Sequence, residues 1–426
     1  MVALLFAAFL LLILIGIDVG FSMILAAWLG VMAKTERAVD AILLPQTMMN
    51  GVNFYALVQI PLFILAGDLM NRGGVTARLV EWSQSLVGHL RGSLGHVAIM
   101  TNLGMAGISG SAVADAIATG KPLIPAMTKS GYGPGFAGGV IVAGAVLGPI
   151  IPPSIPMVVY AQMANVSVGK LFVAGIVPGL LLAGGFFTIC AVMARLRSYP
   201  TLPKVDLGGR LRATGRASWA LAMPVIILLG IRFGLFTDTE VAAVVVVYAL
   251  AVGLLVYRDL RLKEIPGIAF ESAHSSATIL FLLAAAGPFS WLVAESQVDR
   301  HAVQLIRSLS DDPTIALLWI NLFLLIVGIL IEPLPAMVIF LPALLPLVPV
   351  IGVDPIQFGA VVVINLLIGL LTPPVGMLLF VVANIGKIPL ATLSRGVLPF
   401  LVWSIVVLVL LIVFPPLTTW LPGKMM

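Results

Sequence analysis

The stretch Gly104–Pro125, which reads GMAGISGSAVADAIATGKPLIP, interrupts a long apolar sequence with small and polar residues. Its centre holds Ser109, Gly110 and Ser111 and is followed closely by an acid, Asp115. Irregular backbone cannot face lipid, so at membrane depth it is packed in protein or lines a watery cavity. We therefore expect the tip of a re-entrant helical hairpin beside a bound solute. The alternative is that the small residues only let two membrane helices pack closely.

The composition around this stretch is typical of a helical membrane protein. Of 426 residues, 61% are hydrophobic and only 10% are charged, whereas soluble domains carry about 25% charged residues. One span needs roughly 20 apolar residues, and the chain has room for many. The weakly alternating segments of a transmembrane β-barrel are absent from the sequence. The sequence therefore predicts an all-α polytopic membrane protein.

The pattern of charged residues, cysteine and histidines argues against several classes of protein. The net charge of +5 does not indicate nucleic acid, because the basic residues lie in connecting loops. The lone Cys190 and four histidines without paired ligand spacing predict neither a disulfide nor a metal centre. The run Thr119–Pro122 resembles the end of a P-loop, but Pro replaces the required Ser or Thr. We expect no cofactor and no ATP-driven transport.

A second interruption lies in the apolar stretch 136–165, where residues 148–156 read GPIIPPSIP. It contains Gly148, Pro152 and Pro153. Proline lacks an N–H group and disfavours helix in the residue before it. The sequence therefore predicts a discontinuous span, which is a second sign of a segment that lines a cavity.

The second half of the chain repeats these helix breakers in the same order at a constant offset. Gly107 and Gly148 correspond to Gly328 and Gly369, and the pair Pro152–Pro153 corresponds to Pro373–Pro374. The second hairpin tip then reads GILIEPLP over 328–335 and contains Glu332, and the second broken span reads GLLTPPVG over 369–376 and contains Thr372. Chance apolar similarity explains leucine opposite leucine, but not this repeated pairing of breakers, so we predict an internal repeat.

The repeat gives a domain division into residues 1–216 and 217–426. In the first repeat we expect scaffold helices over 1–95, a hairpin and broken helix over 96–170, and a final helix with a cytoplasmic loop over 171–216. In the second we expect the same parts over 217–310, 320–390 and 391–420. The basic loop 195–216 is cytoplasmic by the positive-inside rule. Lysines beside the first hairpin and aspartates beside the second are consistent with inverted halves.

Repeats with interrupted segments at corresponding positions indicate a secondary transporter. Half-helix N-termini offer free N–H groups and a positive dipole end to a carboxylate. Unwound carbonyls, together with Ser109, Ser111, Thr372 and Asn365, offer oxygen ligands to a small alkali cation. We therefore expect cotransport of an organic anion with sodium, with protons as the alternative. An intramembrane enzyme would need a catalytic set that does not appear, and a channel would not need two matched broken spans.

Asp115 and Glu332 are the intramembrane acids of interest, because an ionisable group at that depth is a functional candidate by default. Helix capping is the alternative for both, and a bond to a neighbouring helix is the alternative for Asn365. Asp68 and Glu240 lie near span ends and are expected to be interfacial. The candidate substrate- and ion-binding residues are Ser109, Gly110, Ser111, Asp115, Gly148, Pro152, Pro153, Gly328, Glu332, Asn365, Gly369, Thr372, Pro373 and Pro374.

Four motifs resemble those of one family, the large membrane subunit of TRAP (tripartite ATP-independent periplasmic) transporters. They are GISGSAVAD over 107–115, GLFTDTEVAA over 234–243, DPIQFG over 354–359 and GLLTPPVG over 369–376. The resemblance covers essentially the whole chain. The chain departs from the family at Asp238, where Pro is more usual, and at its second tip, which is richer in proline.

The resemblance implies a multi-pass protein of the bacterial inner membrane that works as an elevator, with both hairpins and broken spans moving against a scaffold. It implies sodium coupling, a small four-helix membrane subunit and a periplasmic binding protein that delivers an organic acid, such as a dicarboxylate, sialic acid or keto acid. Ser109, Ser111, Gly328 and Thr372 become candidate sodium ligands, and the Pro-Pro pairs candidate hinges. The alternative is a stand-alone sodium- or proton-coupled carboxylate carrier.

Overall fold

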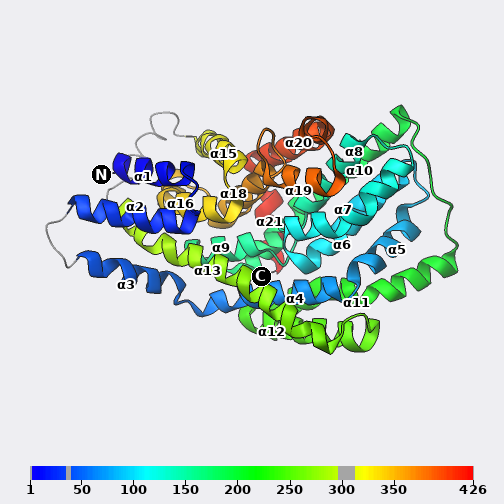
Figure 1. Ribbon diagram of the computed structural model, residues 1–426, viewed down its shortest axis with the longest axis horizontal. Coiled ribbons are helices and arrows are strands. Elements are labelled where there is room, and N and C mark those ends of the chain that lie inside the picture. The colour runs from blue at the N-terminus through cyan, green and yellow to red at the C-terminus, as the bar shows by residue number, and fades with distance from the viewer. Residues whose placement is uncertain (1, 35–39, 296–311, 426) are drawn as a thin grey trace.

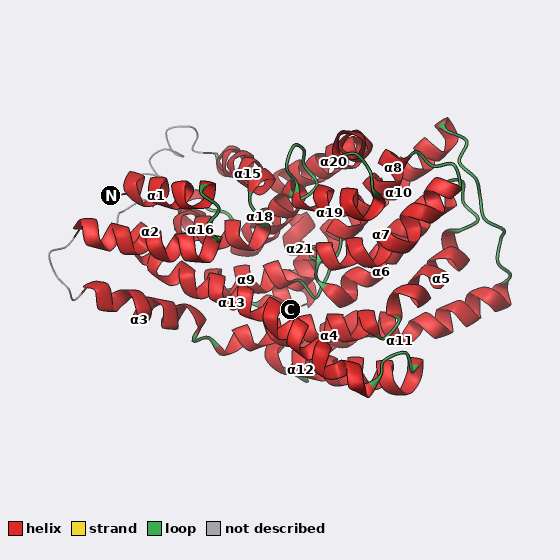
Figure 2. Cartoon of the chain, in the orientation of Figure 1, coloured by secondary structure: helices red, strands yellow, loops and turns green. Residues whose placement is uncertain are grey.

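The computed structural model describes residues 2–34, 40–295 and 312–425, and this part of the chain consists of helices and short loops without a strand (Figure 2). The elements before the basic loop are α1 Val2–Leu14, α2 Val19–Lys34, α3 Asp40–Val52, η1 Tyr55–Val58, α4 Gln59–Arg72, α5 Val75–Val87, α6 Ser93–Ser109, α7 Ala112–Lys129, α8 Pro134–Val146, α9 Ile155–Ala164 and α10 Val168–Leu196.

The elements after it begin with the long helix α11 and include a short π-helix, η2. They are α11 Leu207–Arg232, α12 Asp238–Ala251, η2 Val252–Tyr257, η3 Leu262–Glu264, α13 Ile265–Glu295, α15 Pro313–Leu330, α16 Pro333–Leu344, α17 Leu347–Ile351, α18 Pro355–Gly369, α19 Met377–Gly386, α20 Leu390–Val413 and α21 Pro416–Met425.

Six helices in the described part are long and apolar enough to cross a membrane, and a seventh span results if the bent pair of α3 and α4 counts as one. Other apolar helices are too short to cross alone, among them α8, α9, α18 and α19. These four are the halves of the two interrupted segments, because each pair is joined by a proline-rich loop. The predicted all-α membrane fold with discontinuous helices is confirmed.

The two halves of the chain contain equivalent parts that pack on one another reciprocally. Each half has a hairpin, α6–α7 or α15–α16, followed by a broken span, α8–α9 or α18–α19. Hairpin helix α7 contacts α19 and its counterpart α16 contacts α9, while α8 packs on α20 and α18 packs on α10. Each contact between the halves thus has a counterpart in which the two halves trade roles. An approximate two-fold axis that relates the halves produces this pattern, and such an axis relates the repeats of many transporters.

The hairpins and broken spans occupy the middle of an elongated molecule. In Figure 1, α1, α2 and α3 lie at one end, α5 lies at the other, and α9, α18, α19 and α21 lie between them. The first hairpin starts at Ser93 and the second at Pro313, somewhat before the expected 96 and 320. The earlier start of α15 follows from Asp312, whose carboxylate accepts the backbone N–H groups of Thr314 and Ile315.

Local chemistry accounts for each break. Helix α6 ends at Gly110, whose φ of 60° lies in the left-handed region that glycine tolerates best. Helix α7 then begins after Ser111, which caps it by accepting the N–H of Ala114. In the first broken span, Ser154 caps α9 and donates its hydroxyl proton to the Pro149 carbonyl. The Pro152–Pro153 and Pro373–Pro374 peptide bonds are both cis.

Candidate functional site

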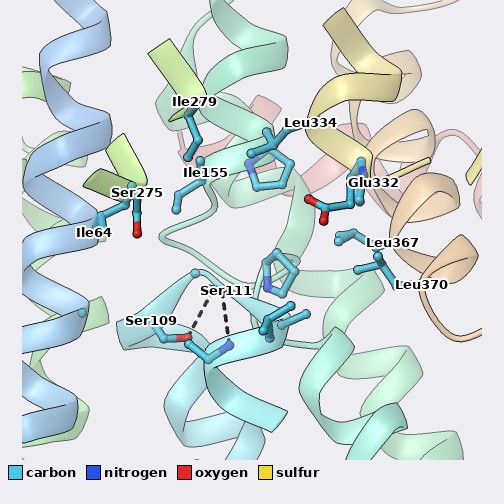
Figure 3. A pocket seen from close by; sticks show the side chains of 18 of the residues that line it. Ile64, Ser109, Ser111, Ile155, Ser275, Ile279, Glu332, Leu334, Leu367 and Leu370 are labelled. Atoms are coloured by element: carbon cyan, nitrogen blue, oxygen red, sulfur yellow. Dashed lines mark hydrogen bonds between the residues drawn. The ribbon is translucent and has the colours of Figure 1, made fainter. Parts of the chain in front are cut away.

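A cavity of about 380 Å³ lies where both hairpin tips, both broken spans, α4 and α13 meet. Figure 3 shows Ser275 and Glu332 on opposite sides of it, with Ser109 and Ser111 at the first tip. Most of the wall is aliphatic, and a few polar side chains contribute to it. These are Asp68, Asn71, Ser109, Ser111, Ser275 and Glu332.

The first tip presents a helix N-terminus to the cavity. Residues 109–114 all line it, and they include the first turn of α7. The Ser109 hydroxyl accepts the N–H of Ser111 at 3.2 Å, a bond drawn in Figure 3. The N–H groups at the start of a helix carry partial positive charge and favour an anion. The predicted tip residues Ser109, Gly110 and Ser111 therefore form a wall suited to a carboxylate.

Asp115 lies behind this tip and not in the cavity wall. It is fully buried, and one carboxylate oxygen accepts the Ser109 hydroxyl proton at 2.5 Å. Its other oxygen, Oδ2, has no hydrogen-bond partner among the described residues. A Cβ atom on Gly148 would lie 2.4 Å from Oδ2, so only glycine lets the first broken span approach the carboxylate so closely. Ser111 caps α7, and Asp115 instead joins the tip to the broken span.

Glu332 is the N-cap residue of α16 by position, but its side chain makes no capping hydrogen bond. The carboxylate points into the cavity instead (Figure 3). Capping therefore does not account for this acid. Because a buried or partly buried charge needs a compensating partner, the open carboxylate is available to a cation or to a donor on a ligand.

The second broken span packs against the second hairpin and lies largely outside the main cavity. A Cβ on Gly369 would approach the Gly328 backbone to 2.3 Å, so the two segments touch through glycines. Gly328 lines an adjoining cavity of about 260 Å³ together with Glu332. The Thr372 hydroxyl donates to the Ile368 carbonyl at 2.7 Å.

The Pro-Pro pairs also lie outside the main cavity wall. The first pair nevertheless contacts the first tip, because a Cβ on Gly110 would lie 2.7 Å from the Pro153 carbonyl oxygen. Pro373 and Pro374 lie in the corresponding loop, and Pro374 is exposed. Each pair thus sits in the loop that separates the halves of a broken span.

Asn365 bonds a neighbouring helix, as the alternative interpretation predicts. Its side-chain amide donates to the backbone carbonyl and to Oδ1 of Asn321 on α15, both at 2.7 Å, in a buried setting. It does not line the main cavity. The side-chain oxygen of Asn365, Oδ1, is buried and has no hydrogen-bond partner among the described residues.

We expect Asn365→Ala to lower stability by about 1–3 kcal/mol, because Asn321 is left with a buried, unpaired acceptor. Thermal unfolding of the purified protein in detergent measures the loss. Asn384→Ala is the matched control, since Asn384 lies on the neighbouring helix α19 and is exposed. Equal melting temperatures for the two variants would contradict the structural role of Asn365.

Sequence reasoning missed the wall of the cavity that α4 and α13 supply. Asp68, which was expected only to lie near a span end, lines the cavity and accepts the Ser272 hydroxyl proton at 2.6 Å. Asn71 and Ser275 line the same side. The sequence offered one signal for this wall, the Gly67–Asp68 pair within an apolar span. In the structure Gly67 packs against the first tip, because a Cβ on it would lie 3.2 Å from the Cα of Ser109.

Two hairpins and two broken spans around one central cavity define this chain as a membrane permease. A family model described as the DctM component of the tripartite ATP-independent periplasmic transporters matches residues 6–417. The chain belongs to this family of TRAP transporter large permeases. With its apolar spans, it is a multi-pass protein of the bacterial inner membrane.

Three relatives of this chain are named for different substrates. The chain is 40% identical to the sialic acid TRAP transporter large permease protein SiaM of Vibrio cholerae, over 96% of this chain and 95% of SiaM. It is 40% identical to the C4-dicarboxylate permease DctM of Pseudomonas aeruginosa, over 87% and 86%. It is 36% identical to the 2,3-diketo-L-gulonate permease YiaN of Escherichia coli, over 89% of each.

A solved structure shares the fold. The YdaH transporter of Alcanivorax borkumensis superposes with a TM-score of 0.66, covering 90% of this chain and 91% of that one. At 15% sequence identity the likeness concerns the fold alone.

Proposed function

We propose that this chain is the large permease of a sodium-coupled importer that takes up an organic acid by an elevator mechanism. The observation that carries the proposal is the central cavity, in which the α7 N-terminus and two serines face Glu332 across a largely aliphatic space. Such an arrangement combines anion-binding N–H groups with oxygen ligands for a cation. The named substrates of the relatives, sialic acid, C4-dicarboxylates and diketogulonate, are all organic acids.

Sodium enters the proposal as a co-substrate. At the first tip the Ser109 hydroxyl, the Asp115 carboxylate and the nearby backbone of the broken span offer hard oxygen atoms within a small, buried volume. At the second tip we assign the same role to Gly328 and Thr372, and the Glu332 carboxylate lines the cavity beside Gly328. A cation bound at either tip would offset the charge of a substrate carboxylate beside it.

The moving part in this proposal comprises the two hairpins and the two broken spans, and the fixed part comprises helices such as α4 and α13. The cavity lies between them, so substrate would be carried past the fixed wall as the moving part shifts. Partners follow from the family relationship: a small membrane subunit that widens the fixed part, and a periplasmic binding protein that delivers the acid.

Uptake into proteoliposomes tests the proposal. The protein is reconstituted with its small membrane subunit, and an inward sodium gradient is imposed with and without the cognate binding protein. Labelled sialic acid, succinate and diketogulonate serve as probes. We expect uptake of an acid that needs both sodium and the binding protein.

Two other outcomes would change the proposal. Uptake without the binding protein would favour a stand-alone carboxylate carrier of similar construction. Uptake that is unaffected by replacing sodium with potassium or choline would contradict the assignment of the two tips as cation sites.

A further inference from the structure

Another cavity, which shares no residue with the central one, lies where the end of α10 meets the first turns of α8 and α20. It has a volume of about 300 Å³, and the three helices around it pack on one another. Arg197 and Arg395 are the charged side chains among the described residues that line it. Arg197 belongs to the basic loop 195–216, which is cytoplasmic by the positive-inside rule. The cavity is therefore basic and opens on the cytoplasmic side.

Neither of these arginines is neutralised by the protein. Within the part of the chain that the structure describes, neither side chain has an ion pair or a hydrogen bond, whereas three other arginines are paired with acids. The sequence explains this, because residues 116–205 and 355–426, which supply α8, α10 and α20, contain no Asp or Glu. Two like charges that share one cavity repel each other unless an anion lies between them. The pair thus indicates an anionic ligand.

The start of α8 adds partial positive charge to the same cavity. A Cβ on Gly133 would lie 3.4 Å from Nη1 of Arg197, so the guanidinium group lies against the N-cap residue of α8. A Cβ on Gly396 would overlap the Gly135 carbonyl group, so α8 and α20 touch here through backbone. The first N–H groups of a helix have no partner within it and favour an anion. Side chains and backbone therefore present donors to one small volume.

An apolar stripe on α20 leads directly to Arg395. The helix is long and apolar enough to cross a membrane. Five apolar residues follow Arg395 on one helix face and are 41–59% exposed: Leu398, Val402, Val406, Val409 and Val413. A stripe of this kind contacts acyl chains, and an arginine at the end of a span reaches the headgroup layer. Arg395 therefore lies where lipid phosphates lie.

We propose that this cavity binds the phosphate headgroup of an anionic phospholipid from the cytoplasmic leaflet. The phosphate oxygens accept hydrogens from Arg197 and Arg395, and the acyl chains lie along the stripe on α20. The planar guanidinium group suits this ligand because it binds phosphate through two parallel hydrogen bonds. The cytoplasmic leaflet is also the one that carries anionic lipid. A soluble phosphate would meet the same arginines but would leave the stripe unused.

Native mass spectrometry of the full-length chain, co-purified in detergent with its small membrane subunit, counts bound lipids and gives their affinities. The probes are dioleoylphosphatidylglycerol and dioleoylphosphatidylcholine, which have the same acyl chains. We expect wild type to bind one phosphatidylglycerol at least about tenfold more tightly than phosphatidylcholine, whose choline cation opposes the arginines. The melting temperature should rise with phosphatidylglycerol. Inorganic phosphate, added at matched ionic strength, separates a soluble anion from a lipid.

A double variant tests the two arginines. Arg197→Gln/Arg395→Gln changes exposed side chains, so the fold should be retained, and we expect the affinity for phosphatidylglycerol to fall by about 100-fold. Arg195→Gln/Lys204→Gln is the matched control, because it removes the same charge from exposed positions that do not line the cavity. Exposed charges outside the cavity are screened by salt, so this control should retain the preference for phosphatidylglycerol.

Each contrary result has a distinct meaning. Equal affinities of the two double variants for phosphatidylglycerol would overturn the site. Equal binding of both lipids by wild type would overturn the selection of an anionic headgroup. A rise in melting temperature with inorganic phosphate but not with phosphatidylglycerol would overturn the lipid as the ligand. These measurements involve no transported acid, so they are independent of the proposed transport function.

Discussion

Replacement of Asp115 by asparagine is expected to lower sodium-driven uptake by about 100-fold or more while the protein still folds. The asparagine oxygen can still accept the Ser109 hydroxyl proton, so the local hydrogen bond is retained. Asparagine cannot supply the negative charge that a carboxylate would offer to a bound cation at this fully buried position beside the broken span. Removing one partner of a buried charge pair costs about 3–5 kcal/mol, and each 1.4 kcal/mol is about a tenfold change in affinity.

The measurement is the initial rate of uptake into proteoliposomes as a function of sodium concentration. Asp354→Asn is the matched control, because Asp354 is exposed and caps α18 by accepting the N–H groups of Ile356 and Gln357. Asparagine caps helices about as well as aspartate does, so this variant should retain wild-type uptake. Wild-type sodium dependence in Asp115→Asn would show that the cation binds elsewhere.

The second large effect is expected from Gly369→Ala, which should lower both stability and uptake. The added Cβ would lie 2.3 Å from the Gly328 carbonyl group. Both contacting atoms belong to backbone, so no side chain can move aside, and the second hairpin must shift away from its broken span. Overpacking of this kind costs about 1–3 kcal/mol or more. The shift also displaces Glu332, which lies four residues after Gly328 at the tip.

Melting temperature in detergent and uptake in proteoliposomes are measured together for this variant. Gly184→Ala on α10 is the control, because a Cβ there meets nothing within 4 Å. Alanine is the better helix former, so Gly184→Ala should be neutral or slightly stabilising. If both variants melt and transport alike, the glycine contact does not fix the second tip.

The breaks in the helices were predictable because their causes are local. Gly110 ends α6 through its own backbone torsion, and Ser111 starts α7 through a bond to a residue three positions away. The prolines over 149–156 and at 373–374 exclude a continuous helix without help from the rest of the chain. Repetition of these breakers in both halves then predicted the equivalent hairpins and broken spans.

The roles of particular polar residues within those segments could not be predicted from the sequence alone. Asp115 and Glu332 had the same description from sequence, an acid near a hairpin tip. In the structure Asp115 is buried behind the tip, while Glu332 enters the cavity. Asn365 instead bonds Asn321 on a neighbouring helix. Which way each side chain points depends on the neighbours that surround its helix, and those neighbours come from other parts of the chain.

The sequence by itself determined the class of this protein, its internal repeat and the places where its membrane segments break. These properties follow from composition and from the backbone restrictions of glycine and proline, which act within a few residues. Only the tertiary structure decided that Asp68, Asn71 and Ser275 complete the cavity wall beside the hairpin tips. That wall joins α4 to α13 across about half of the chain, and only long-range helix packing brings such distant residues together.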